Sequence, residues 1–173
     1  LSFVFDVTDC IKRVGENKLE VKVTDKLSLD YPYGKQCKKR GGMWYTPVSG
    51  IWKSVWLESV PDKYMAGIKI TPDLHGVKLQ VFGAVAGFAV CVKLPSGALL
   101  EKSYEDNEGY IEIPEKEVKH WTTDAPYLYE MKITAGADEV DTYFALRTIE
   151  IKKIEGINRV CLNGEPIFLH GVL

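Results

Sequence analysis

The sequence has few of the residues on which metal and redox chemistry depend. Its 173 residues include only 3 histidines and 4 cysteines. The cysteines, at positions 10, 37, 91 and 161, are too far apart for a metal knuckle or a CxxC redox pair. The histidines are equally scattered, so we predict no bound transition metal. The unpatterned cysteines favour reduced thiols and leave one disulfide open.

Long apolar runs and an excess of one charge are also missing. No apolar run approaches the roughly 20 residues that span a bilayer, so we expect no membrane partner. Lysine and arginine number 22 against 24 acidic residues, and this balance argues against binding to nucleic acid. The one basic cluster, Lys35, Lys38, Lys39 and Arg40, is interpreted as a solvated turn in a loop.

The dominant pattern is an alternation of apolar and polar residues with period two, which predicts an all-β protein. Short strands are expected at 65–70, 77–82, 88–94, 99–104, 110–113, 127–133 and 140–151, separated by turn sequences. Their number and spacing favour a two-sheet sandwich of immunoglobulin type. The rival helix at 114–121 is barely two turns long, so we favour strands throughout.

The same alternation indicates strands at 3–7, 19–24 and 50–58, with a long polar loop over 25–42. Pro61 and Asp62 then interrupt the chain, and we place a domain boundary there. Near the other end, Asn163-Gly164 predicts a type I′ turn between strands at 157–162 and 166–169. Both ends of the sequence are interpreted as cuts through a longer protein.

Candidate catalytic groups are hard to find. A glycosidase needs two carboxyl groups flanking one bond, one of them held protonated, but the carboxylates here fall on polar strand faces or in turns. The aromatic cluster of Trp44-Tyr45 with Trp52 and Trp56 is the most distinctive local feature, because sugar rings pack on exposed aromatic faces. Core or interdomain packing is the alternative. Asp25, at the mouth of the long loop, could accept hydroxyl hydrogen bonds or help bind a cation, and its alternative is an Asx turn.

Five ordered motifs resemble glycoside hydrolase family 2, the family of large bacterial β-galactosidases, β-glucuronidases and β-mannosidases. Residues 5–23 contain FDVTD and then GENKLEVKV, similar to the end of the family's sugar-binding jelly roll. Residues 44–58, WYTPVSGIWKSVWLE, are similar to its SGI(W/F) strand. The others are HWTTDAPYLY at 120–129, YFALRTI at 143–149 and VCLNGEPIFLHGV at 160–172.

The resemblance implies three parts: 1–60 as the C-terminal part of a galactose-binding-like jelly roll, 61–153 as an immunoglobulin-like sandwich, and 154–173 as the start of a catalytic (β/α)₈ barrel. It implies a retaining enzyme whose two catalytic glutamates lie later in the barrel, so this chain is expected to hold no catalytic residue and to be inactive alone. Asp25 matches an aspartate that contacts sugar and sodium in some β-galactosidases of the family. Arg147 matches a family arginine that is expected to make an interdomain or sandwich contact and to take no part in catalysis.

The resemblance thus predicts a non-catalytic portion of a glycosidase, most simply a β-galactosidase. No cofactor is expected in this chain, while the longer protein could use sodium or magnesium. A carbohydrate is the expected partner, with Asp25, Trp44 and Tyr45 as candidate binding residues. Unpaired strand edges in 1–60 also allow a homo-oligomer. The alternatives are a free-standing carbohydrate-binding module and a spacer domain.

Overall fold

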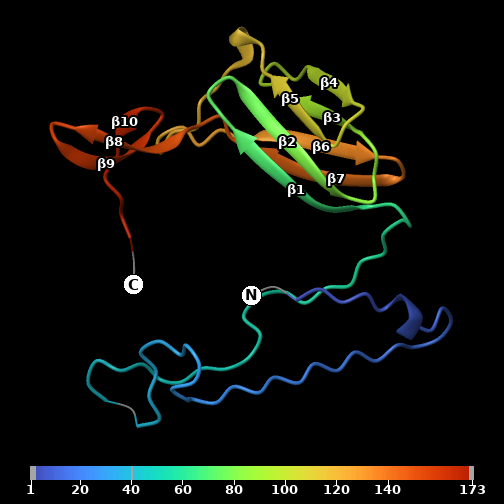
Figure 1. Ribbon diagram of the computed structural model, residues 1–173, viewed down its shortest axis with the longest axis vertical. Coiled ribbons are helices and arrows are strands. Elements are labelled where there is room, and N and C mark those ends of the chain that lie inside the picture. Colours follow the sequence, from blue (N-terminus) through green and yellow to red (C-terminus); the bar gives the residue numbers. More distant parts are fainter. Residues whose placement is uncertain (1–2, 40, 172–173) are drawn as a thin grey trace. The chain divides into compact units, whose positions relative to one another are not determined.

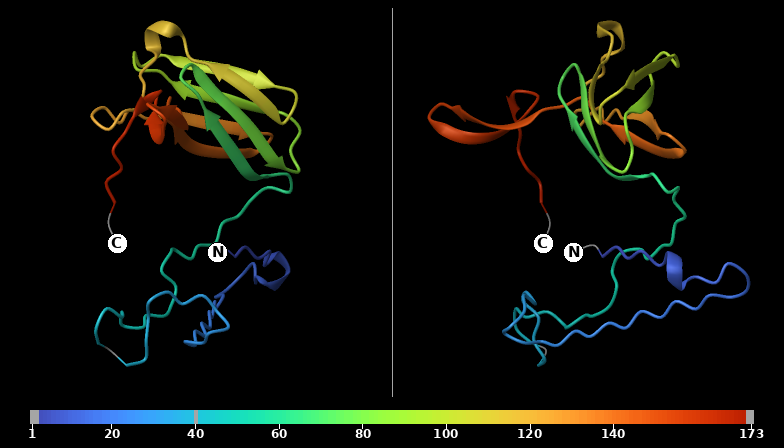
Figure 2. Two further views of the ribbon diagram at one scale, coloured as in Figure 1. Left: turned by 60° about the vertical axis from the view of Figure 1, so that its left-hand side comes forward. Right: turned by 45° about the vertical axis from the view of Figure 1, so that its right-hand side comes forward.

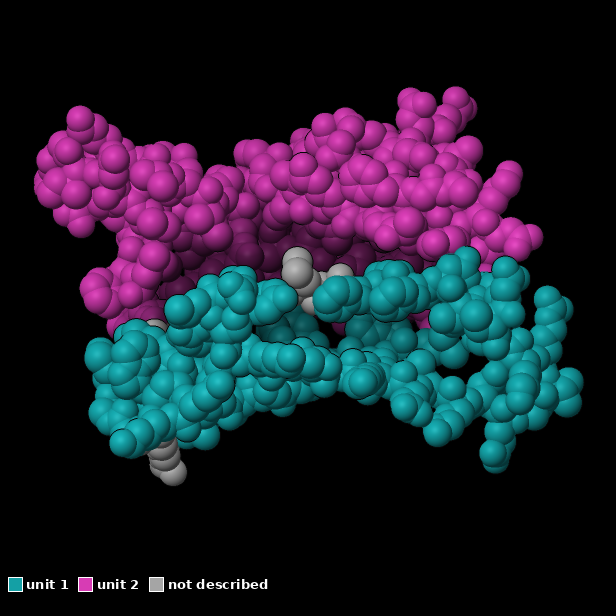
Figure 3. Space-filling model, turned by 60° about the horizontal axis from the view of Figure 1, so that its bottom comes forward, with its two compact units in different colours: residues 1–57 teal, residues 58–173 magenta. Residues whose placement is uncertain are grey.

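The computed structural model describes residues 3–39 and 41–171. The chain divides into two compact units, Leu1–Leu57 and Glu58–Leu173, coloured separately in Figure 3. Two predicted features include residues outside the described part: Arg40 of the basic cluster, and the extreme ends of the first and last predicted domains. The three-part domain assignment stays a prediction.

The first unit is extended chain with little regular structure. Its one helical element is η1, a 3-10 helix at Thr8–Cys10, and isolated bridges join Gln36 to Tyr45 and Gly41 to Trp44. The strands expected at 3–7, 19–24 and 50–58 are not hydrogen-bonded strands among the described residues, and that prediction is wrong. Alternation favours an extended backbone, but a strand also needs a neighbour to pair with, and these segments have none there.

The second unit is built on the predicted sandwich of two antiparallel sheets (Figure 1). One sheet has the order β1-β2-β5 and the other β4-β3-β6-β7, with the chain crossing between sheets after β2, β4 and β5. This confirms the all-β class and the immunoglobulin-like arrangement. The strands are β1 (Met65–Pro72), β2 (Gly76–Gly83), β3 (Phe88–Lys93), β4 (Leu99–Tyr104), β5 (Glu108–Glu112), β6 (Tyr129–Ala135) and β7 (Asp138–Phe144).

The core lies between the two sheets because alternate residues of each strand point inward. On β2 these are Val77, Leu79 and Val81, and on β6 Tyr129, Met131 and Ile133, all buried. The intervening residues are mostly polar, as expected for a sandwich whose outer faces are solvated. The period-two pattern in the sequence therefore corresponds to the inner faces of the sheets.

Tyr129, at the start of β6, connects the core to the segment before it. Its ring is fully buried and stacks on Phe144 with centroids 5.0 Å apart. Its hydroxyl donates to the Glu117 carbonyl at 2.8 Å and accepts from the Lys119 N–H at 2.7 Å. Burial raises the pKa of Tyr129. The arrangement is similar to the tyrosine corner of immunoglobulin-like domains, with the difference that the backbone partners lie 10 and 12 residues upstream.

The outer edge of the four-stranded sheet is acidic. β7 is its last strand and carries Glu139 and Asp141 on an exposed face. Lys132, on neighbouring β6, lies 2.5 Å from Glu139 and 3.7 Å from Asp141. One lysine is therefore paired with two carboxylates. Because its single positive charge balances only one of them, this edge keeps a net negative charge.

One expectation for the second half of the chain needs correction. The expected strand 140–151 is two strands in different sheets, β7 and β8 (Ile149–Ile154), because the chain turns away at 145–148. There Leu146 is fully buried, and its carbonyl accepts from Trp121 N–H at 2.9 Å. The segment 114–121 holds only the 3-10 helix η2, Glu115–Glu117, in agreement with the rejection of a helix there.

A third sheet of order β10-β9-β8 contains β9 (Ile157–Leu162) and the short β10 (Glu165–Pro166). Figure 2 shows it extending from the sandwich. Asn163 and Gly164 have φ of 52° and 89°, as a type I′ turn requires, which confirms the predicted turn. The β8–β9 turn, at Glu155 and Gly156, uses the same conformation and was not predicted.

Asn163 ties this third sheet to the sandwich. Its side-chain oxygen accepts from Thr148 N–H at 3.0 Å, and its side-chain amide donates to the Trp121 carbonyl at 3.0 Å. Its own N–H donates to the Thr148 carbonyl at 2.9 Å. One turn residue thus links three segments that are distant in the sequence.

Candidate functional site

Asp25 lies where the long loop of the first unit begins. Its Oδ2 accepts a hydrogen bond from the Ser49 hydroxyl at 2.9 Å. Because these residues are 24 positions apart, this bond closes a larger loop, residues 25–49, which contains the predicted loop 25–42 and is called the loop below. Asp25 is exposed, so its carboxylate can accept a further hydrogen bond from a ligand hydroxyl.

Trp44 and Tyr45 lie within the same loop. Tyr45 N–H donates to the Lys35 carbonyl at 2.8 Å, and Cys37 N–H donates to the Tyr45 carbonyl at 3.3 Å. A weaker bond of 3.4 Å joins Trp44 N–H to the Gly41 carbonyl. The two side chains are 51% and 53% exposed, so each leaves about half of its surface available to a ligand.

Gln36 is the loop residue that the sequence reasoning missed. Its side-chain oxygen accepts from Val48 N–H at 2.8 Å, and its amide donates to the Tyr33 carbonyl at 2.9 Å. It therefore connects the aromatic part of the loop to the residue next to Ser49, and through Ser49 to Asp25. A single glutamine in a polar loop carries no signal that would have identified this role.

The structure places the three predicted residues in one loop without joining them directly. No hydrogen bond links Asp25 to Trp44 or Tyr45 within residues 3–39 and 41–171. Two more tryptophans lie beyond the loop: Trp52, 85% exposed with Lys53 Nζ 4.8 Å from its ring centroid, and Trp56, 72% exposed. Aromatic surface of this extent on a soluble protein usually marks an interaction surface.

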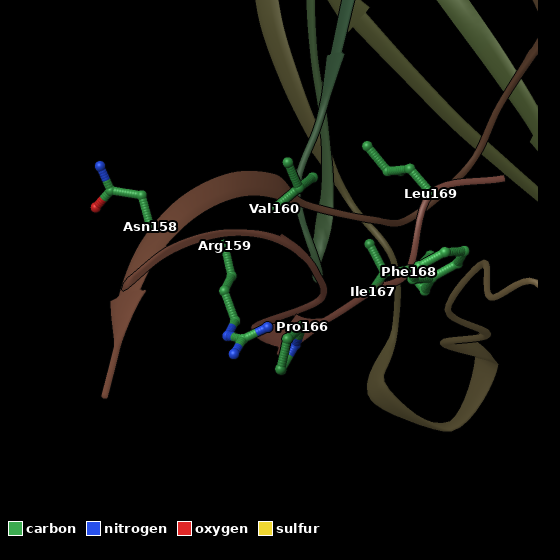
Figure 4. Close-up of a pocket in the computed structure, with 7 residues that line it drawn as sticks. All are labelled: Asn158, Arg159, Val160, Pro166, Ile167, Phe168 and Leu169. Atoms are coloured by element: carbon green, nitrogen blue, oxygen red, sulfur yellow. The ribbon is translucent and has the colours of Figure 1, made fainter. Parts of the chain in front are cut away.

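Two hollows lie in the described part of the second unit, and neither is lined by Asp25, Trp44 or Tyr45. One, of about 400 Å³, lies between β9 and the segment after β10 (Figure 4). Val160, Pro166, Ile167, Phe168 and Leu169 line it, with Arg159 as its charged group. The other, of about 520 Å³, is lined by Lys119, His120, Ala125, Pro126 and Tyr127. No carboxyl group lines either hollow.

Three acidic side chains among the described residues, Asp6, Asp73 and Glu108, have a displaced pKa, and in each the pKa is lowered. Burial by itself raises the pKa of Asp73. Hydrogen bonds from the backbone N–H groups of residues 75 and 76 and from the Tyr110 hydroxyl lower that pKa by more, so the net shift is downward. A catalytic acid needs the opposite shift, because it must hold its proton near neutral pH.

Within the part of the chain that the structure describes, no group of three or more His, Cys, Asp or Glu residues could hold a metal ion. The described cysteines are free thiols. The same part of the chain contains no helix long and apolar enough to cross a membrane.

No family model matches the chain, but individual proteins do. Over 97% of its length it is 24% identical to a beta-galactosidase of Arthrobacter sp. (strain B7) and 29% identical to one of Lactococcus lactis subsp. lactis (strain IL1403). These matches cover 16% and 17% of the two relatives. The chain therefore spans about a sixth of the curated relatives it matches.

Solved structures give a consistent result. A Faecalibacterium prausnitzii beta-glucuronidase matches with a TM-score of 0.51 and 34% identity, over 62% of this chain and 18% of that one. A Ruminococcus gnavus beta-glucuronidase matches with a TM-score of 0.54 over 65% of this chain and 20% of that one, and at 21% identity it supports the fold alone. These matches show that the chain is similar to one segment of proteins named beta-galactosidase and beta-glucuronidase, which agrees with the resemblance of its five motifs to glycoside hydrolase family 2.

Proposed function

We propose that this chain is a non-catalytic part of a retaining glycosidase that removes terminal β-linked sugars, and that the sugar is a β-galactoside. The observation that carries the proposal is the similarity over 97% of the chain to curated proteins named beta-galactosidase. The similarity to beta-glucuronidases supports the wider class of enzyme acting on β-linked sugars.

The arrangement of acidic groups in the second unit supports a non-catalytic role. Glu108 pairs with Lys78 at 2.5 Å, and Glu130 pairs with Lys93 at 2.9 Å, both on exposed strand faces. Such pairs keep carboxylates ionised and solvated, whereas retaining hydrolysis needs two carboxyl groups about 5.5 Å apart with one protonated. The sandwich would then brace the catalytic part of a longer protein.

The first test is to incubate the 173-residue chain with chromogenic aryl β-galactoside, β-glucuronide and β-mannoside. We expect no release of nitrophenol above the buffer rate. Release at enzymatic rates from any of the three would refute the non-catalytic assignment.

The second test uses the gene. We expect the codons after Leu173 to continue into a polypeptide with two essential glutamates, and the longer protein to hydrolyse the β-galactoside fastest. Faster hydrolysis of the β-glucuronide would contradict the proposed sugar. A stop codon directly after Leu173 would contradict the proposal that this chain is part of a longer glycosidase.

The exposed loop of the first unit favours a second candidate, a free-standing carbohydrate-binding module. Asp25 would accept sugar hydroxyls while Trp44 and Tyr45 pack on the ring. Titration calorimetry with galactosides and glucuronides separates the two candidates. The enzyme proposal predicts no binding by this chain, whereas millimolar or tighter binding that Trp44→Ala abolishes and Trp52→Ala leaves unchanged would favour the module.

The family resemblance implies that the longer protein could use sodium or magnesium. Asp25 offers a carboxylate and Ser49 a hydroxyl, and hard cations take the rest of their oxygen ligands from other carboxylates, backbone carbonyls and water. We propose that any such requirement belongs to the longer protein. It would appear there as a dependence of hydrolysis on added cation that Asp25→Asn weakens.

A further inference from the structure

Asn163-Gly164 is a chemically labile pair. An asparagine loses its side-chain amide when the backbone nitrogen of the next residue attacks the side-chain carbonyl carbon. The attack closes a succinimide ring and releases ammonia, and one water molecule then opens the ring to aspartate or isoaspartate. Glycine favours this route, because it has no side chain to hinder its nitrogen. Asn163 is the only asparagine of the sequence that precedes a glycine.

The structure holds the Asn163 side chain by both polar atoms of its amide. Oδ1 accepts from the Thr148 N–H and Nδ2 donates to the Trp121 carbonyl, each at 3.0 Å. Attack by the Gly164 nitrogen makes the carbon between these two atoms tetrahedral, and Nδ2 must then leave as ammonia. The reaction therefore requires Asn163 to give up these bonds.

The partners of Asn163 belong to backbone that is itself held in place. Trp121 N–H donates to the carbonyl of the fully buried Leu146 at 2.9 Å. The Arg147 guanidinium lies over the Trp121 ring, 4.9 Å from its centroid, and this stacking adds attraction between the two segments. Asn163 N–H donates to the Thr148 carbonyl at 2.9 Å. These contacts, which we call the junction, join the third sheet to the sandwich (Figure 1).

We propose that Asn163-Gly164 is a deamidation site that the junction protects, and that reaction there makes opening of the junction irreversible. The product side chain carries a carboxylate, which accepts hydrogen bonds but has no N–H to donate. A carboxylate oxygen would face the Trp121 carbonyl, so two acceptors would meet and neither would be paired. Isoaspartate also lengthens the backbone by one carbon and no longer fits the tight turn.

The strength of the protection depends on how rarely the junction opens. When opening and closing are faster than the chemistry, the deamidation rate equals the rate of the unprotected chain multiplied by the open fraction. The hydrogen bonds of Asn163 and Trp121 and the stacking of Arg147 all lower that fraction. Deamidation should therefore be at least about tenfold slower in the native chain than in the unfolded chain.

The test compares the whole chain in mildly alkaline buffer with the same chain unfolded in urea at the same pH. Mass spectrometry of the tryptic peptide 160–173 measures the conversion of amide to acid at Asn163. Separation of the aspartate and isoaspartate forms identifies the succinimide route. We expect both forms in urea and a rate at least about tenfold lower in the native chain. Asn107 and Asn158, which precede Glu108 and Arg159, should react far more slowly than Asn163 in urea.

Two variants examine the junction directly. Arg147→Ala removes the stacking on Trp121 and should speed deamidation in native buffer without changing the rate in urea. Arg13→Ala is the matched control: it removes an exposed arginine of the first unit and should change neither rate. Asn163→Asp reproduces one product, and the backbone N–H groups at positions 121 and 163 should then exchange with solvent faster, while those of β2 and β6 keep their rates.

The comparison of native and unfolded chain needs no variant, so it decides the protection even if a variant does not fold. Equal rates in the two conditions would overturn the proposal, and so would the absence of deamidation at Asn163 in urea. A folded Arg147→Ala that reacts like Arg13→Ala would contradict protection by the junction. Unchanged exchange at positions 121 and 163 in Asn163→Asp would show that the junction survives the reaction and would overturn its irreversibility.

Discussion

Replacing Tyr129 with phenylalanine tests whether the tyrosine hydroxyl holds the two sheets of the sandwich together. The change keeps the ring, and with it the stacking on Phe144, while removing one oxygen. That oxygen makes two hydrogen bonds, to the Glu117 carbonyl and from the Lys119 N–H. Tyr129→Phe is therefore a test of hydrogen bonding with little change in packing.

The expected cost follows from what the two partners lose. Glu117 is 8% exposed, so little water can reach its carbonyl group, whereas Lys119 is exposed and its N–H can bond to water. A buried polar group left without a partner costs about 1–3 kcal/mol. We expect Tyr129→Phe to lower the free energy of unfolding by that amount. Tyr129→Ala should cost about 3–5 kcal/mol, because it also leaves a cavity.

Urea unfolding followed by circular dichroism measures the difference in the free energy of unfolding. An unchanged slope of that free energy against urea concentration would show that the variant exposes the same surface on unfolding. Tyr143→Phe is the control: this side chain on β7 is 62% exposed, and its loss of a hydroxyl should change stability by less than about 0.5 kcal/mol. Hydrogen exchange of the Lys119 amide should quicken only in the Tyr129 variant. Equal stability of the two phenylalanine variants would refute the reasoning.

Three further changes probe other parts of the second unit. Asn163→Ala should lower the free energy of unfolding by about 1–3 kcal/mol, because it removes two side-chain hydrogen bonds and places alanine at a positive φ. Asn163→Gly should cost less, because glycine loses the same two hydrogen bonds but adopts the positive φ without strain. Urea unfolding compares the two variants. Leu79→Ala should cost about 2–5 kcal/mol in the same assay, and a smaller loss would show a loosely packed core. Burial, together with the hydrogen bond to Asp73, raises the pKa of Tyr110 to about 12, so its contribution to stability is complete below pH 10 and declines as the pH rises toward 12. Tyr110→Phe should flatten that decline in alkaline unfolding, and an unchanged slope would contradict it.

The sandwich could be predicted from the sequence because its strands are locally encoded. Between residues 65 and 144 the alternation is regular, and turn residues such as Gly97 and Gly136 have the positive φ that their turns require. The break at 145–148 could not be predicted in this way. No glycine or proline marks it, and it depends on contacts of Leu146 and Thr148 with residues distant in the sequence.

The first unit shows the opposite case. Alternation at 19–24 correctly indicates an extended backbone, but whether an extended segment becomes a strand depends on a partner that local sequence does not specify. The candidate loop was found through its aromatic residues and Asp25. Its organising residue, Gln36, was missed because its role arises from two tertiary hydrogen bonds.

The acidic edge of β7 has a consequence for how far association can proceed. If two sandwiches approached each other edge to edge, antiparallel about Val140, Glu139 of each would face Asp141 of the other, and the repulsion would oppose pairing. This border therefore offers no ready site for strand-by-strand growth. Concentrated solutions should accordingly find this side of the sandwich resisting conversion into filaments.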